Sequence, residues 1–153
     1  MKICGFLQED HIILDLKPGE KKQILEDFMK SLKDRDLITD ERIILEELLK
    51  RESLGSTGLE KGIAVPHALT DRVKEPFLAL AVVKEGVDFE AVDQMPTYVI
   101  LLLLGNRNNP GFQLKVLAHI CRLVKETRIV ERIRKAKSPA DICAIFDEEE
   151  GKI

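Results

Sequence analysis

A histidine follows a proline near the middle of the chain, at Pro66-His67. The neutral imidazole of histidine has a nucleophilic nitrogen near pH 7, and a phosphoryl group bound to that nitrogen is labile enough to be passed on. Pro66 fixes its own φ and biases Val65 toward extended geometry, so we expect His67 to start from a stiff strand end. A rigid base suits a nucleophile that must meet a phosphoryl group in line. A Pro-His pair alone is more often a buried turn, so the interpretation depends on its neighbours.

Residues that could bind phosphate lie shortly before this histidine. Arg51 offers a planar fork of donors that matches phosphate oxygens. Ser56, Thr57 and Gly58 can supply hydroxyl and backbone N–H donors from a nest-like loop. A helix end followed by a polar turn would explain these residues without any chemistry, but turn formation does not require their combination with His67. We interpret them together as one candidate phosphoryl site.

With their neighbours, these residues resemble a known protein family. The pattern Arg-Glu-x-x-Gly-Ser-Thr-Gly at residues 51–58 and Gly-Ile-Ala-Val-Pro-His-Ala at 62–68 closely match the enzyme IIA domain of the fructose/mannitol type. That domain is a component of the bacterial phosphoenolpyruvate-dependent sugar phosphotransferase system (PTS), and its relatives include the nitrogen-regulatory enzyme IIA proteins. The resemblance covers nearly the whole chain, including residues 87–89 and 101–104.

The resemblance implies a fold, a reaction and partners. The implied fold is an α/β three-layer sandwich, with a mixed β-sheet of about five strands flanked by helices on both sides. His67 would accept phosphate, at Nε2, from an HPr-like phosphocarrier protein. It would then pass the phosphate to a cysteine of an enzyme IIB, or hold it as a signal for regulatory target proteins. No cofactor is implied. The domain is expected over residues 1–147, with a frayed tail over 148–153.

One position departs from the family pattern. Many members carry a second histidine at the start of the helix that follows the Asn/Gly/Pro loop, and the corresponding residue here is Gln113. Gln113 shares a helical stripe with Val116 and Ile120, so we expect it to point inward toward the site. A glutamine donates a hydrogen bond but carries no charge. The substitution could therefore shift the rate or equilibrium of transfer while leaving the nucleophile in place.

The other two histidines are not assigned to the site. His119 shares a predicted helix face with Lys115 and Arg122, and this face is expected to be exposed to solvent. His11 begins the first predicted strand and belongs to no motif. Since His119 and Cys121 are two residues apart on a helix, they do not face each other, and no CxxC pattern is present. We therefore expect no metal site.

Apolar periodicity predicts the elements that must position these residues. Strands are expected at 11–16, 63–65, 77–83 and 98–104, and helices at 20–33, from 40 to about 54, from 110 past 124, at 129–136 and at 138–146. Thr39 or Asp40, and Asn109, are the expected N-caps of two helices. The two longer strands are almost continuously apolar, which is typical of strands covered on both faces. The order of elements predicts a sheet sandwiched between helices.

Composition excludes several classes of protein. The 153 residues carry a net charge of −3 without a basic stripe, so we expect one globular domain with no nucleic-acid partner. The longest apolar run, Tyr98 to Leu104, is far shorter than the ~20 residues that span a bilayer, so no direct membrane insertion is expected. Three widely spaced cysteines and the absence of a signal peptide predict a cytoplasmic protein with free thiols.

Three functions remain open at the level of sequence. The first is a transport relay, in which His67 carries phosphate toward a sugar permease. The second is a nitrogen/potassium-regulatory binding protein whose partner choice depends on His67 phosphorylation, with little or no transport role. The third is a degenerate binding module that is never phosphorylated. Intact Arg51, Ser56, Thr57 and His67 argue against the third function, whereas Gln113 keeps it open.

Overall fold

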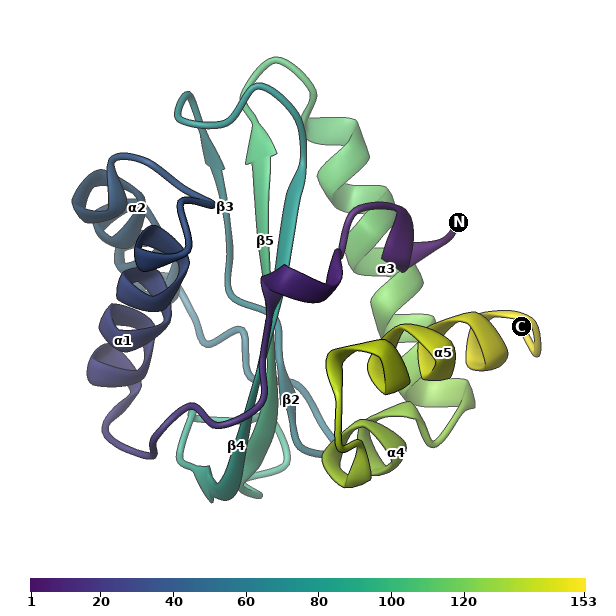
Figure 1. Ribbon diagram of the computed structural model, residues 1–153. Helices are drawn as coiled ribbons and strands as arrows, with labels where there is room; N and C mark the ends of the chain where they lie inside the picture. The colour runs from purple at the N-terminus through teal and green to yellow at the C-terminus, as the bar shows by residue number, and fades with distance from the viewer.

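Two long antiparallel strands form the centre of the sheet in the computed structural model, which describes all 153 residues. These are β4 (Phe77–Val87) and β5 (Thr97–Asn106). The outer strands are β1 (Ile12–Ile13), parallel to β4, and β2 (Ile63–Ala64) and β3 (His67–Thr70), both parallel to β5. The five-stranded sheet is therefore mixed, and β2 and β3 follow one another along the same edge of β5 (Figure 1).

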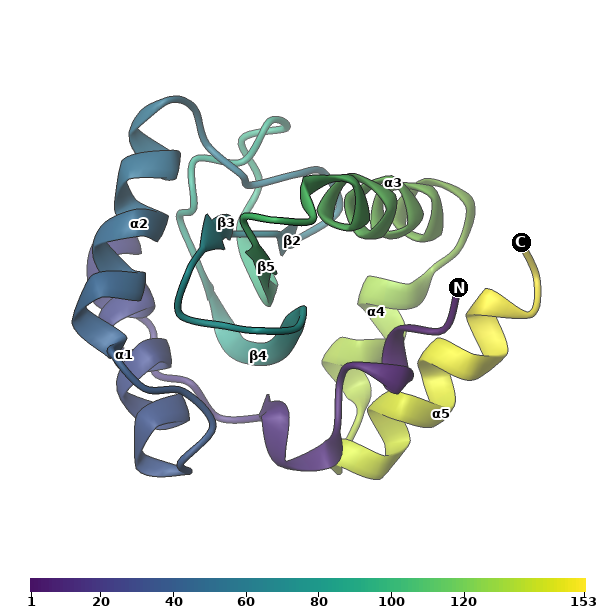
Figure 2. The same ribbon diagram turned by 90° about the horizontal axis from the view of Figure 1, so that it is seen from above.

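Helices cover both faces of this sheet. One layer consists of α1 (Lys21–Asp34) and α2 (Glu41–Ser53). The other consists of α3 (Pro110–Glu126), α4 (Ile129–Lys135) and α5 (Pro139–Glu150), with two short 3₁₀ helices, Ile3–Gly5 and Glu9–His11, beside α5 and β4. The view from above shows the sheet between the two helical layers (Figure 2). The predicted three-layer α/β sandwich is confirmed. None of the helices is both long and apolar enough to cross a membrane.

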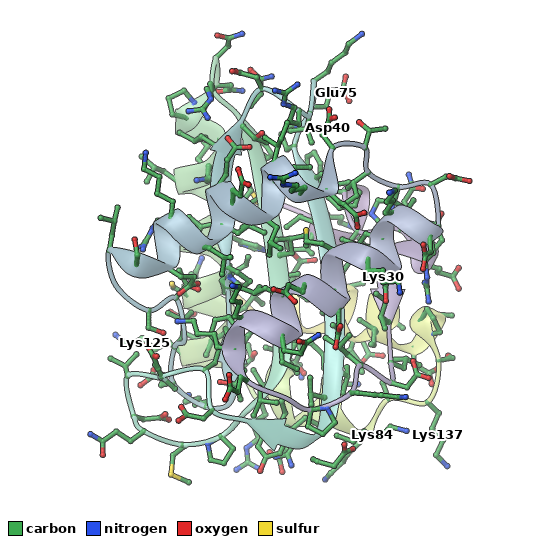
Figure 3. The ribbon with its side chains drawn as sticks, turned by 90° about the vertical axis from the view of Figure 1, so that its left-hand side faces the viewer. Lys30, Asp40, Glu75, Lys84, Lys125 and Lys137 are labelled. Carbon is green, nitrogen blue, oxygen red and sulfur yellow. The ribbon has the colours of Figure 1, made fainter.

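Alternate residues of the central strands supply two separate hydrophobic cores. Leu101 and Leu103 of β5 pack with the α3–α5 layer, while Ile100 and Leu102 pack with the α1–α2 layer. Successive side chains of a strand point to opposite faces, so a strand with a core on each side must be apolar at every position. This explains the unbroken apolar runs in the sequence. The outer surface of the α1–α2 layer is polar, and Lys30 projects from it into solvent (Figure 3).

The strand that carries His67 differs from the sequence prediction. Three strands were expected between the second and third helices, with His67 at the end of the first, but the structure has four, and His67 begins β3. Pro66 cannot donate a ladder hydrogen bond, which interrupts the edge strand. Its carbonyl still accepts from Leu103 N at 3.0 Å, so pairing with β5 resumes one residue later.

Helix ends also differ from expectation. Asp40 and Asn109 occupy N-cap positions, but neither side chain makes a capping hydrogen bond, whereas Ser138 Oγ accepts from Asp141 N at 3.2 Å. The expectation of a frayed tail from residue 148 is wrong, because α5 continues to Glu150. Glu149 pairs with Arg132 at 2.9 Å, and Glu150 accepts a hydrogen bond from Ile3 N at 3.0 Å. These contacts hold the last helical turn.

Candidate functional site

An open cavity of about 380 Å³ lies at the β3 edge of the sheet, where β3 runs between α2 and α3 (Figure 2). Its lining residues are Glu47, Lys50, Arg51, Leu54, His67, Ala68, Leu69, Arg107 and Gln113. Glu47, Lys50 and Arg51 of α2 and its C-cap residue Leu54 recur at i, i+3, i+4 and i+7, so they lie on one helix face. His67 and Leu69 lie on the same side of β3. Three of the predicted site residues, Arg51, His67 and Gln113, therefore line one cavity.

The ring of His67 is fixed by its own backbone. Its Nδ1 lies 2.8 Å from the carbonyl oxygen of Val65. Because a carbonyl can only accept, Nδ1 must carry the proton in this hydrogen bond, and the neutral tautomer then has its lone pair on Nε2. No protein group is hydrogen-bonded to Nε2, so the lone pair of this nitrogen is not engaged.

Electrostatics keep this imidazole neutral. Burial lowers the pKa of His67 below its ordinary value of 6.5, and the positive charge of Arg51 lowers it further. The hydrogen bond to Val65 and the negative charge of Glu52 raise the pKa, but they do not reverse the shift. His67 is therefore unprotonated near pH 7, which is the state that a nucleophile requires.

Three of the side chains that line the cavity are cationic, and one, that of Glu47, is anionic. Arg51 lies in the last turn of α2, and its Nη1 donates to Gly55 O at 2.9 Å, which holds the guanidinium at the helix end. Lys50 and Arg107 also line the cavity. Such a set of donors and positive charges suits an anion with several oxygens, such as a phosphoryl group.

An ion-pair network joins two of the residues that line the cavity, Glu47 and Arg107. Arg107 Nη2 lies 2.6 Å from Glu47 Oε2, and Arg107 Nε lies 3.4 Å from Asp71 Oδ2. The other oxygen of Glu47 accepts from Thr70 Oγ1 at 2.6 Å. Sequence reasoning missed this network. The spacing of Glu47, four residues before Arg51 on one helix face, could have placed Glu47 beside the site. Arg107 comes from a loop with no such periodicity, so its pairing with Glu47 could not have been predicted.

Ser56 and Thr57 lie outside the cavity, contrary to expectation. Ser56 Oγ donates to Phe89 O at 2.7 Å and accepts from Gly58 N at 3.0 Å. Thr57 uses both its hydroxyl and its backbone N–H to bind the carboxylate of Glu52. The loop donors that were expected to meet phosphate are thus engaged in internal hydrogen bonds.

These internal bonds hold the end of α2 in place. Glu52 also pairs with Lys21 of α1 at 2.8 Å, and both side chains are largely buried. The ammonium group of Lys21 lies 4.7 Å from the centre of the Phe89 ring. Because Glu52 directly follows Arg51, the network fixes the helix turn that carries the arginine. Ser56 and Thr57 therefore act on the site indirectly, by holding the turn of α2 that carries Arg51.

Gln113 is buried, and its Oε1 has no hydrogen-bond partner. It lines the cavity from the first turns of α3, as the helical stripe predicts. His119, further along the same helix, does not. The prediction of a solvent-exposed His119 is wrong, since its side chain is only 14% exposed and its Nε2 lies 2.6 Å from Glu150 Oε2. This contact could not be predicted from local patterns, because it depends on where α5 ends.

Fold and site together define a small α/β domain that presents a neutral histidine in a cationic surface cavity. The chain belongs to the family described as phosphoenolpyruvate-dependent sugar phosphotransferase system, EIIA 2, whose model matches residues 5–149.

Relatives in this family carry two kinds of name. The chain is 31% identical to the nitrogen regulatory protein of Bradyrhizobium diazoefficiens, over 95% of each chain. It is 29% identical to the PTS system fructose-specific EIIABC component of Bacillus subtilis, where 97% of this chain spans 23% of that protein. Among solved structures, nitrogen regulatory protein IIA-Ntr from Neisseria meningitidis is 33% identical with a TM-score of 0.86, covering 94% of this chain and 98% of that one.

Proposed function

We propose that the protein is a phosphoryl carrier of the phosphoenolpyruvate-dependent sugar phosphotransferase system, with His67 as its phosphoryl acceptor. The observation that carries this proposal is the state of the imidazole: Nδ1 is bound to Val65 O, and Nε2 is free in a cavity with three cationic side chains. Family membership supports the same reaction class. The donor in the proposal is an HPr-like phosphocarrier protein in the cytoplasm.

The chemistry follows from this arrangement. The lone pair of Nε2 attacks phosphorus, a new N–P bond forms, and the N–P bond to the donor histidine breaks. The ring gains positive charge as the bond forms, and the Nδ1–H bond to Val65 O stabilises that charge. Arg51 and Lys50 balance the charge of the phosphoryl oxygens. In onward transfer, the thiolate of an enzyme IIB cysteine attacks phosphorus and the Nε2–P bond breaks.

Onward transfer to an enzyme IIB is supported by the likeness to a second solved structure. The complex of enzyme IIAMTL and phosphorylated enzyme IIBMTL from Escherichia coli includes a chain with the same fold, at a TM-score of 0.74 and 20% identity. For this chain, the IIB partner is part of our proposal.

A regulatory role is the second candidate function. Relatives named nitrogen regulatory protein match this chain along 80–95% of their own length, with 95% of each chain covered in one case. In this role the phosphoryl group stays on His67 and changes which regulatory target proteins bind. Gln113, in place of a second ionisable ring, fits a protein in which rapid onward transfer is not required.

The relay is tested by incubating the protein with phosphoenolpyruvate, enzyme I and an HPr-like carrier and measuring its intact mass. We expect a gain of one phosphoryl group that is labile in acid and stable in base, and no gain would overturn the proposal. The regulatory role predicts that some partner is recovered preferentially with one phosphorylation state. Equal recovery of every partner with unmodified and phosphorylated protein would count against it.

A further inference from the structure

Arg107 faces the cavity but is held by carboxylates in the free protein. Its Nη2 lies 2.6 Å from Glu47 Oε2, and its Nε lies 3.4 Å from Asp71 Oδ2. Glu47 is largely buried, with its other oxygen taken by Thr70, whereas the Arg107 side chain is half exposed. The carboxylate of Glu47 is therefore the fixed partner of this ion pair, and the guanidinium is the side that can move.

A phosphoryl group on His67 would change the charge balance around this pair. It would bring between one and two negative charges into a cavity that already contains Glu47. Like charges in a partly buried site repel, since screening by water is weaker there. A guanidinium that turned toward the phosphoryl oxygens would relieve this repulsion and gain bidentate hydrogen bonds.

One residue that lines the cavity has a buried oxygen without a hydrogen-bond donor. Gln113 is more than nine-tenths buried, and its Oε1 has no partner. A buried acceptor without a hydrogen bond costs free energy. Arg107 has five N–H donors, more than its two carboxylate contacts require. Gln113 Oε1 packs against Gly105 and is closed off from the cavity, so the remaining donors of Arg107 are available to phosphoryl oxygens.

The backbone around Arg107 is anchored, so the change would fall on the side chain. Asn106 Nδ2 donates to Val73 O at 2.7 Å, and Asn108 N donates to Asn106 Oδ1 at 2.8 Å. Leu54, which lines the same cavity, is 81% exposed. A docking partner that contacts Leu54 would therefore meet a different arrangement of charge when Arg107 has turned inward.

We infer that Arg107 is a phosphoryl-binding residue that Glu47 and Asp71 hold in the free protein and that exchanges these carboxylates for the phosphoryl group on His67. The ion pair between Arg107 and Glu47 is then intact in the free protein and broken in the phosphorylated protein. This inference rests on the proposed function, because it requires His67 to be phosphorylated.

The test uses phosphoramidate as the phosphoryl donor, so that no carrier protein is needed. The fraction of phosphorylated protein at equilibrium is measured by intact mass for wild type, Arg107→Gln and Glu47→Gln. The control is Arg122→Gln, an arginine on α3 that pairs with Glu126 at 3.1 Å away from the cavity. We expect the phosphorylation equilibrium constant to fall about tenfold in Arg107→Gln, as for loss of a charge-assisted hydrogen bond. It should rise in Glu47→Gln and stay unchanged in the control.

A second measurement needs no variant of the site. The Nε–Hε resonance of Arg107 should shift when wild-type protein is phosphorylated, while that of Arg122 should not. If wild type gains no phosphoryl group from phosphoramidate or from the complete carrier system, the proposed function itself fails. If wild type is phosphorylated but the Arg107 resonance is unmoved and Arg107→Gln keeps the wild-type equilibrium, the inference about Arg107 is overturned and the function stands.

Discussion

His67 and His119 are both partly buried, and each uses one ring nitrogen in a short hydrogen bond. The partner of His67 is the neutral carbonyl of Val65 at 2.8 Å, and its other nitrogen opens onto a cationic cavity. The partner of His119 is the carboxylate of Glu150 at 2.6 Å, which also accepts from Ile3 N. Burial does not distinguish the two rings. The neutral partner of His67 and the cations nearby suit a nucleophile. The buried carboxylate bound to His119 instead makes that ring a structural link between α3, α5 and the N-terminus.

The largest expected effect separates the two histidines by chemistry. His67→Ala should abolish acid-labile, base-stable phosphorylation by an HPr-like carrier, because it removes the nucleophilic Nε2. His119→Ala should retain it, since His119 does not line the cavity. Intact-mass measurement after incubation with phosphoenolpyruvate, enzyme I and the carrier checks both variants. A phosphoryl group on His67→Ala protein would show that the nucleophile lies elsewhere.

The next largest effect is on stability, and it is expected at His119 rather than at His67. His119→Ala would leave Glu150, whose side chain is only 5% exposed, without its ring partner. Ile3 N would remain as a donor to Glu150 Oε2, so the free energy of unfolding should fall by about 1.5–3 kcal/mol, the usual range for one hydrogen bond to a charged group. Urea denaturation followed by circular dichroism measures this fall. Arg122→Ala on the same helix, with an exposed ion pair, is the matched control and should change stability little.

The pH dependence of the reaction sharpens the comparison further. Because burial lowers the pKa of His67 below 6.5, the ring should stay neutral and reactive into mildly acidic solution. Phosphorylation by phosphoramidate should fall only as pH drops through this lowered pKa. The same shift makes the folded state bind the proton less readily than the unfolded state, so stability declines as pH falls below 6.5. Imidazole ¹⁵N shifts measured against pH check this, and a midpoint at or above 6.5 would contradict it.

The smallest expected effect is at Gln113. Gln113→His should preserve phosphorylation of His67, because the nucleophile and its bond to Val65 are unchanged. We expect the phosphorylation rate to change by only a few fold, as for replacement of one neutral donor by another group. Quench-flow or time-resolved mass measurement against wild type checks the rate. A loss comparable to that of His67→Ala would mean that the amide of Gln113 is indispensable.

The sequence predicts the features that depend on local patterns. Continuous apolar runs indicated β4 and β5, and a helical stripe placed Gln113 facing inward. The pairing of Arg107 with Glu47 was not predictable, because it joins a loop to a helix distant along the chain. The same holds for Glu150 with His119. Ser56 was misjudged for a related reason, since its acceptor, Phe89 O, comes from a different segment.

The bond between Val65 and His67 has a consequence for the identity of the phosphorylated product. A histidine in solution can be phosphorylated at either ring nitrogen, and the two products are different compounds. Here the backbone, two residues before the ring, blocks Nδ1 in the way that a protecting group blocks one of two equivalent positions in a synthesis. The fold should therefore yield a single regioisomer, whichever phosphoryl donor is supplied.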